Sequence, residues 1–217
     1  MTIRRSARRR TVTLRVSEGA VTLHAPVGVP EAELLRFVER KRDWVEKHLR
    51  AFAARALPAY RFEDGEGLPL LGETLTLRLR EGPRAERMGD ELWLPPGAPE
   101  ARRAALEAFY RREALAYFEA RAPEDAARLG RGVTAVRLTE ARTRWGSCTA
   151  AGVLRFNWRV VLGPRGVAEY LCAHEVAHLR EMNHGPRFWQ QVARLCPEYL
   201  HWRALLRREG HRYTLGE

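Results

Sequence analysis

The segment HEVAH, at residues 174–178, places two histidines four residues apart and a glutamate directly after the first histidine. On a helix, residues four apart lie about 6 Å from each other on one face, so both imidazoles can bind one tetrahedral zinc ion. Glu175 projects one step around the helix and reaches the water on the metal, not the metal itself. The pattern predicts a metal helix in which His174 and His178 are ligands and Glu175 is a general base.

A catalytic zinc site takes three protein ligands and keeps one open position. His184 is the first candidate for the third ligand, because the Gly-Pro pair at 185–186 indicates that the metal helix has ended and the chain can turn back. Two alternatives stay open. Some zincins use a downstream carboxylate, which would be Glu198, and Glu181 is a weaker candidate that fits better as a partner of a ligand ring or as a solvated side chain.

The spacing of the three histidines equals that of the HExxHxxGxxH motif, but the sequence departs from the class that carries it. Glu181 stands at the position of the glycine, and no methionine follows Met182 to form a Met-turn. The chain is therefore not a metzincin.

The first part of the chain has the pattern of a small β-rich unit. TVTLRV and VTLHAP alternate apolar and polar residues on either side of the turn SEGA, which predicts a β-hairpin. Apolar residues at helical spacing predict one helix over about 31–50, and TLTLRLR and ELWLPP predict two more strands. We expect residues 1–97 to form an N-terminal β-rich subdomain with one helix.

The second part mixes long helices with short strands. Residues 99–129 carry the apolar stripe of one long or broken helix, and VTAVRLTE and GVLRFNWRVV predict strands around the turn-rich TRWGSCTAAG. FWQQVARL and PEYLHWRALLRREG are expected to be helical, with Trp189 and Leu200 among the core residues. We expect residues 98–217 to form the metal-binding catalytic subdomain of an α+β protein.

Length and cysteine content limit the class of protein. At 217 residues the chain can bury a core without a disulfide or a structural metal, so a metal site is expected to be functional. The three cysteines lie far apart without a CxxC pair, which argues against a disulfide framework. The basic N-terminus lacks the apolar run of a signal peptide, and no window is apolar enough to span a membrane. We expect a cytoplasmic, reduced protein with no membrane partner.

The net charge of +11 suggests an anionic ligand, but only Lys41 and Lys47 are lysines among the 38 basic residues. Such a bias toward arginine is as typical of codon usage as of a designed basic surface. One cluster is denser than the rest and contains no acid: Arg4, Arg5, Arg8, Arg9 and Arg10. It predicts either the binding site of an anionic partner or a solvated tail and edge strand.

The sequence resembles the YgjP-like zinc metallopeptidases nearly from end to end. The resemblance is most specific in TRWGSC, RFNWRVVLGP and HEVAHLREMNHGPRFW, in this order and spacing, and Val176 stands where similar sequences tend to have leucine. It implies a zincin-like catalytic half, with the HExxH helix and a small sheet, beside an N-terminal β-rich half. It also implies one zinc ion per chain, with His174, His178 and His184 as ligands and Glu175 as the catalytic carboxylate.

A zinc-dependent hydrolase of this kind can act on two classes of substrate. A peptide, the first expectation, would lie extended along the strand that holds Phe156 and Asn157, by β-augmentation. A nucleoside triphosphate is the alternative, because some similar proteins carry a UTP pyrophosphatase label. Its phosphates would be bound by arginines beside the motifs, unless these pair with Glu140 or Glu169: Arg142, Arg144, Arg159 and Arg187.

Two further hypotheses belong to other classes. In one, the zinc is structural and the arm from Arg4 to Arg10 binds nucleic acid. In the other, Cys148 or Ser147 is a nucleophile, but no separate histidine remains as its base once the metal has its ligands. Among the residues beside the motifs, the substrate contacts that we expect from the sequence are Arg144, Asn157 and Arg187.

Overall fold

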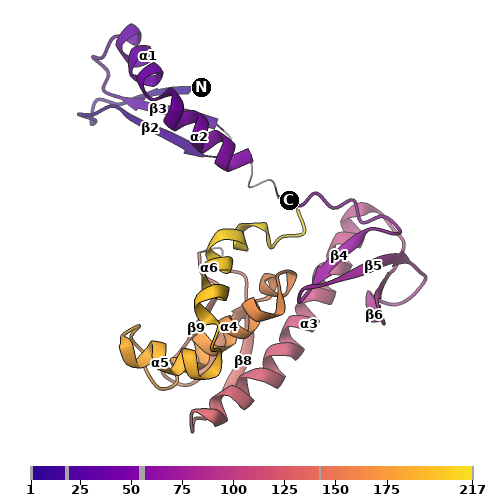
Figure 1. Ribbon diagram of the computed structural model, residues 1–217. Coiled ribbons are helices and arrows are strands. Elements are labelled where there is room, and N and C mark those ends of the chain that lie inside the picture. Colours follow the sequence, from indigo (N-terminus) through magenta and orange to yellow (C-terminus); the bar gives the residue numbers. More distant parts are fainter. Residues whose placement is uncertain (1, 18–19, 54–56, 142, 217) are drawn as a thin grey trace. The chain divides into compact units, whose positions relative to one another are not determined.

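The computed structural model describes residues 2–17, 20–53, 57–141 and 143–216. The chain divides into two compact units, Met1–Leu57 and Pro58–Glu217, which we call unit 1 and unit 2 (Figure 1). Both combine helices with small sheets, so the protein has the α+β class expected from the sequence. Within the described ranges, no helix combines the length and the apolar character that crossing a bilayer requires.

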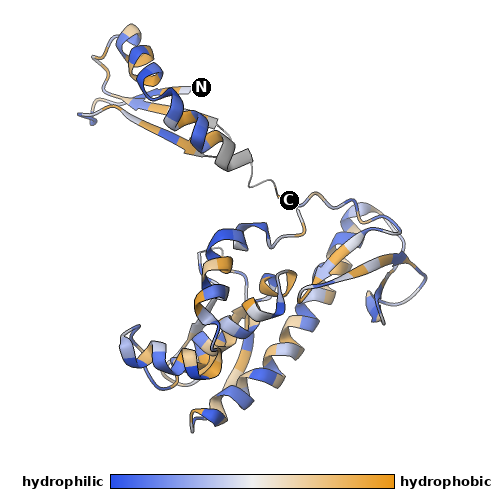
Figure 2. Ribbon diagram, viewed as in Figure 1, coloured by the Kyte–Doolittle hydropathy of each residue, from blue (hydrophilic) through white to orange (hydrophobic). Residues whose placement is uncertain are grey.

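Unit 1 is a three-stranded sheet followed by two helices. The strand order is β1-β3-β2, with β1 parallel and β2 antiparallel to β3. The elements are β1 (Thr2–Arg5), β2 (Thr13–Ser17), β3 (Ala20–Ala25), α1 (Glu31–Arg40) and α2 (Arg42–Ala53). Leu23, Ala25 and Leu34 are the buried centre of this unit, with Ile3 and Leu14 packed against them. One face of the sheet thus packs against α1, and in Figure 2 α1 alternates between hydrophilic and hydrophobic residues.

Two predictions for unit 1 can be compared with these elements. The hairpin is confirmed as β2 and β3. The single helix over 31–50 is wrong, because the backbone leaves helical geometry at Lys41, whose N–H donates to the Val38 carbonyl, and α2 starts anew at Arg42. The N-terminal arginine cluster begins inside a strand, β1, which pairs with β3.

Unit 2 is built around the long helix α3. Its strands are β4 (Gly67–Leu70), β5 (Glu73–Leu79), β6 (Glu86–Met88), β7 (Glu91–Leu94), β8 (Ala135–Thr139), β9 (Gly146–Cys148) and β10 (Val153–Asn157). Its helices are α3 (Pro99–Arg128), the 3-10 helix η1 (Trp158–Leu162), α4 (Arg165–Ala177), α5 (Pro186–Leu195), α6 (Tyr199–Glu209) and the 3-10 helix η2 (Gly210–Arg212).

The two sheets of unit 2 share one hydrophobic core. One sheet has the order β4-β5-β7-β6, and the other has the order β8-β10-β9, with β10 in the middle. α3 packs against α4, η1 and β8, and its Phe118 stacks on Phe156 of β10 with ring centroids 3.9 Å apart. A single buried cluster runs from Leu68 and Leu77 to Phe188 and Leu206. This core holds α4, which carries the HEVAH segment, against β9 and β10.

The division into units differs from the predicted boundary at residue 97. The turn between β4 and β5 contacts the segment before α4, where the Leu71 N–H donates to the Val161 carbonyl at 2.7 Å. Leu71 and Gly72 both have positive φ, 50° and 88°, as a tight hairpin turn requires. Residues 58–97 therefore fold with the helices that follow them, and the chain divides after Leu57.

The helix predicted over 99–129, either long or broken, is a single unbroken helix, although Pro123 lies inside it. Two other local predictions for unit 2 are wrong. The strand predicted over GVLRFNWRVV ends at Asn157, whose side-chain oxygen accepts a hydrogen bond from the Arg159 N–H and so caps η1. Leu200, expected in the core, is 65% exposed.

Candidate metal centre

The helix α4 brings His174 and Glu175 into the centre of unit 2. It begins directly after Pro164, which has no N–H to leave unpaired, and ten of its residues are buried. A Cβ on Gly166 in its first turn would overlap the indole of Trp202, so glycine permits the close approach of α6. α4 ends at Ala177, and His178 is its C-cap with helical backbone angles.

Three imidazoles converge just beyond the end of this helix. The candidate ligand atoms of His174, His178 and His184 all lie within 4.8 Å of one another. The Nε2 atoms of His174 and His184 are 3.1 Å apart. Nitrogen ligands on tetrahedral zinc are about 3.3 Å apart, because each zinc–nitrogen bond measures about 2.0–2.1 Å. The spacing of these imidazoles therefore fits a metal ion.

The protonation of the histidines also fits a metal ion. Burial, with smaller contributions from the other two histidines and Arg203, lowers the pKa of His174 to about 3. Burial also lowers the pKa of His178, whose Nδ1 lies 3.2 Å from the Glu181 carbonyl oxygen. Donation of the Nδ1 proton to this carbonyl leaves the Nε2 lone pair free. Both rings are thus neutral at pH 7, as a ligand must be.

His184 reaches the cluster because α5 begins directly after it. The Trp189 Nε1–H donates to the His184 carbonyl at 3.1 Å, and the indole stacks on the His184 ring. The buried Phe188 packs against all three imidazoles, with ring centroids 4.9, 4.6 and 4.6 Å away. Among the described residues, the cluster contains neither Glu181 nor Glu198. Glu181 contributes only its backbone carbonyl, which faces His178.

Glu175 lies beside the cluster and against the backbone of β9. Its side chain is only 4% exposed, and a Cβ on Gly146 would lie 2.5 Å from its Oε1. Burial raises the pKa of the Glu175 carboxyl to about 8, and the positive charge of Arg144 opposes this rise. A carboxyl group with a pKa near neutrality is suited to accept and return a proton. The glycine of the TRWGSC segment leaves the space that this carboxyl occupies.

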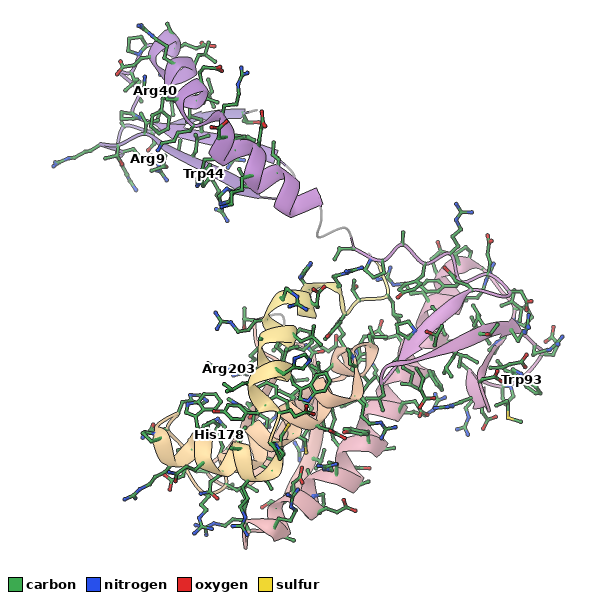
Figure 3. All side chains as sticks on the ribbon, viewed as in Figure 1. Arg9, Arg40, Trp44, Trp93, His178 and Arg203 are labelled. Carbon is green, nitrogen blue, oxygen red and sulfur yellow. The ribbon has the colours of Figure 1, made fainter. Side chains whose placement is uncertain are left out.

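A pocket of about 260 Å³ opens beside His174 and Glu175. Figure 3 labels His178 and Arg203 in this part of unit 2. Tyr170 and three arginines, Arg144, Arg203 and Arg207, line the pocket. A larger pocket of about 590 Å³ shares Arg144 and Arg207 and adds Arg103, Asn157, Arg159 and Glu140. The space around the candidate metal centre is therefore rich in guanidinium groups.

The predicted substrate contacts lie in different surroundings. Arg144 is exposed and lines both pockets. Asn157 is buried, and its amide nitrogen donates to the Ala141 carbonyl while its oxygen accepts from the Arg159 N–H. Arg187 is exposed in the first turn of α5 and lines neither of the two pockets. Arg142 lies outside the described residues.

The expected acidic partners of these arginines pair with other residues. Glu140 forms an ion pair with Arg111, and Glu169 lies 3.8 Å from Arg121. Arg159 lies over the ring of Trp158, with its Cζ 4.6 Å from the centroid. Of the arginines beside the motifs, Arg144 lines both the pocket of about 260 Å³ and the pocket of about 590 Å³.

The strand that was expected to bind a peptide has no free edge. β10, with Phe156 and Asn157, pairs with β8 on one side and β9 on the other, so β-augmentation along it is excluded. In the described part of the chain, β9 pairs along one edge only. The Trp145 carbonyl accepts a hydrogen bond from the Asn157 N–H, and the Thr149 N–H donates to the Val153 carbonyl. The N–H and C=O groups of Gly146 and Cys148 therefore point to the outer edge.

The nucleophile hypothesis finds no support at Cys148. Burial, and then the negative charge of Glu175, raise the pKa of its thiol to about 11. The thiol is therefore protonated near neutral pH, and the thiolate is the nucleophilic form.

Sequence reasoning missed several residues of the site. Gly146 makes room for the carboxyl group of Glu175. Arg203 and Arg207 are four residues apart on α6, which put them on one face toward the pocket. This spacing was visible in the sequence, whereas the contact of Gly146 depends on the pairing of β9 with β10.

Comparison with known proteins identifies one family. No curated protein and no solved structure matches the sequence. The family model described as YgjP-like, metallopeptidase domain, matches residues 10–209, which confirms the resemblance seen in the motifs. The name of this family supports a metal-dependent hydrolase. Because the match covers most of both units, the chain belongs to the YgjP-like metallopeptidase domain family.

Proposed function

We propose that the chain is a zinc-dependent peptidase in which His174, His178 and His184 hold the ion and Glu175 is the general base. The observation that carries the proposal is the convergence of three imidazoles beside one buried carboxyl group. Membership of a metallopeptidase family agrees with it. The proposal includes a zincin-like character for unit 2, supported by the packing of α4 against β9 and β10.

The chemistry follows from the position of Glu175. A bound zinc ion supplies Lewis acidity, which polarises a carbonyl oxygen and acidifies water. Glu175 accepts the proton of the attacking water and later returns it to the leaving nitrogen. The positive charge of Arg144 favours the charged carboxylate of Glu175, while burial favours its protonated form. The side chain can therefore both accept and return a proton.

The edge of β9 is the proposed place for the substrate backbone. The outward N–H and C=O groups of Gly146 and Cys148 can pair with an extended peptide as an added strand. Because Gly146 contacts Glu175, a peptide on this edge would pass close to the general base.

Cleavage of peptides tests this proposal. A peptide library and an unfolded protein are incubated with the zinc-loaded protein, the metal-free protein and the variants Glu175→Gln and Glu169→Gln, and products are identified by mass spectrometry. We expect cleavage by the zinc-loaded protein and by Glu169→Gln. Glu169 lies on the same helix as Glu175, but its carboxyl group faces Arg121 of α3. Cleavage by Glu175→Gln at the wild-type rate would contradict the general-base role. A zinc-loaded protein that cleaves no peptide would contradict the substrate class.

A second candidate substrate is a nucleoside triphosphate, and the arginine-lined pockets favour it. Arg144 and Arg207 line both pockets, and Arg203 lies near His174. Arginine binds phosphate oxygens with paired hydrogen bonds and stabilises their developing charge. The same general base would then serve hydrolysis of a phosphoanhydride.

Release of pyrophosphate from a panel of nucleoside triphosphates tests this candidate. The double variant Arg144→Gln/Arg207→Gln should lose release at least tenfold. The matched control Arg131→Gln/Arg187→Gln removes the same charge from two exposed positions outside both pockets and should stay within twofold of wild type. Release that persists in the first double variant, or that survives Glu175→Gln, would exclude nucleotide hydrolysis at this site.

A further inference from the structure

Unit 1 carries most of the excess positive charge of the chain. Residues 1–57 contain 13 arginines and lysines against six acidic residues, a surplus of seven in a net charge of +11. The described acidic residues of unit 1 all lie on α1 and α2. In the described strands and in the loop between β1 and β2, every lysine, arginine, aspartate or glutamate position is an arginine.

The register of the sheet separates these arginines from the core. Ile3, Leu23 and Leu14 are partners across the three strands and belong to the hydrophobic cluster with Leu34 of α1. Neighbouring residues along a strand point to opposite faces. The two adjoining rows therefore point to the face away from this cluster: Arg4, His24 and Thr13 in one, and Thr2, Thr22 and Arg15 in the other. This open face is cationic and rich in hydroxyl groups.

A third arginine joins this face from the loop that follows β1. The Arg9 Nη1–H donates to the Thr13 hydroxyl at 2.9 Å. Burial lowers the pKa of His24, and the positive charges of Arg9, Arg4 and Arg15 lower it further, in keeping with guanidinium groups close to its ring. Arg5 differs from these three, because its guanidinium donates to the carbonyls of Val27 and Val29.

An aromatic hollow adjoins the open face at the edge of β2. It has a volume of about 250 Å³ and is lined by Thr13, Leu14, Phe37, Lys41 and Trp44. Trp44 is 39% exposed and stacks on His48 with ring centroids 3.9 Å apart. Figure 3 labels Arg9 and Trp44 on this unit. Thr13 belongs to both features, since it accepts the hydrogen bond of Arg9 and lines the hollow.

We propose that unit 1 binds single-stranded nucleic acid, with phosphates on the face of Arg4, Arg9 and Arg15 and a base against Trp44. Proteins that bind single strands combine a cationic surface along the backbone with exposed aromatic side chains on which bases stack. Cations spread over two strands and a loop suit a polyanion better than a single ion. A membrane surface suits the open face less well, because its two rows carry no apolar side chain to insert.

This binding is a function separate from hydrolysis, because all of its residues belong to unit 1 and the metal cluster belongs to unit 2. It also differs from the hypothesis of a structural zinc, since it leaves Glu175 its role in catalysis.

Fluorescence anisotropy with a labelled single-stranded oligonucleotide of mixed sequence tests the proposal on the full-length protein. The triple variant Arg4→Gln/Arg9→Gln/Arg15→Gln should bind at least tenfold more weakly. It should also reduce the slope of log K against log salt by about 2, since each phosphate contact with a single strand contributes about 0.7. The matched control Arg36→Gln/Arg40→Gln/Arg42→Gln removes the same charge from the helices and should bind within twofold of wild type.

The aromatic contact has its own pair of variants. Trp44→Ala should weaken binding roughly tenfold with an unchanged salt slope, because it removes the ring on which one base stacks and leaves the phosphate contacts in place. Leu35→Ala, at a residue that is 49% exposed on α1, should bind as wild type. Circular dichroism at the assay temperature checks that each variant is folded.

Three outcomes would overturn the proposal. Equal losses in the two triple variants would show that only net charge matters. No binding by wild type at low salt would exclude a nucleic-acid surface. Stronger binding to vesicles of anionic phospholipid than to the oligonucleotide, with the same dependence on Arg4, Arg9 and Arg15, would identify a membrane as the partner.

The test does not depend on the proposed hydrolase. Glu175→Gln should bind the oligonucleotide as wild type does, whether or not it retains turnover.

Discussion

Glu175 on α4 and Gly146 on β9 are in such close contact that a Cβ on the glycine would lie 2.5 Å from the carboxyl oxygen. The proposed general base therefore contacts a strand that comes almost thirty residues earlier in the chain. Substitution of Gly146 by alanine should push the carboxyl group away from the three imidazoles.

We predict that Gly146→Ala lowers kcat/KM at least tenfold and leaves the zinc content unchanged, because displacement of about 1 Å at a catalytic group costs roughly a hundredfold in rate. Gly132→Ala is the matched control, since a Cβ there meets nothing within 4 Å. Kinetics and metal analysis of both proteins check the prediction. Normal turnover in Gly146→Ala would show that the contact does not position Glu175.

Removal of the metal should destabilise the protein. A ligand that binds only the folded state adds about 2.7 kcal/mol at a hundred times its Kd, which corresponds to roughly 5–10 °C in Tm for a chain of this size. We expect a strong chelator to lower Tm by this amount in wild type and to have no effect in His184→Ala. His201→Ala, at an exposed histidine outside the cluster, should respond as wild type. An equal response in His184→Ala would place the metal elsewhere.

The packing of α4 on α6 should be sensitive to one methyl group. Gly166→Ala introduces a Cβ that overlaps the Trp202 indole, so we predict a loss of about 1–3 kcal/mol in the free energy of unfolding, measured in urea. In a Trp202→Ala background the same substitution should cost less than half as much. An equal cost in both backgrounds would mean that the indole is not the source of the strain.

Acid should remove a contribution of Asp64 to stability. Its carboxylate accepts hydrogen bonds from the Leu79 N–H and from Arg78, and these lower its pKa below the ordinary value of 3.8. A lowered pKa in the folded state stabilises the fold above pH 3.8, and this contribution is lost as the pH falls through the folded value. Wild type should therefore exceed Asp64→Asn in stability most at neutral pH. A difference that stays constant into acid would contradict this linkage.

The sequence predicted the convergence of the imidazoles because that geometry is local. His174 and His178 are one helical turn apart, and the Gly-Pro pair at 185–186 marks the turn that returns His184. The third position was less certain before the fold was known, since Glu198 was also a candidate. The structure leaves Glu198 outside the cluster, and a hydrogen bond from Trp189 of α5 to the His184 carbonyl holds His184 in place.

Features that depend on pairing between distant segments could not be predicted from the sequence. The pattern of apolar residues in β10 does not reveal that both of its edges are occupied, which moves the proposed peptide site to β9. The helix breaks at Lys41, where the sequence has no proline or glycine that would predict a break. The arginine cluster was visible, but the face of the sheet that carries Arg4 and Arg15 became clear only from the strand register.

The central claim is that the ion held by the three imidazoles and the Glu175 carboxyl act together. The most direct test measures bound zinc per chain and turnover in the same preparations of wild type, Glu175→Gln and His178→Ala. We predict one zinc ion and turnover in wild type, one zinc ion without turnover in Glu175→Gln, and neither in His178→Ala. Turnover in Glu175→Gln, or a full zinc content in His178→Ala, would contradict this account.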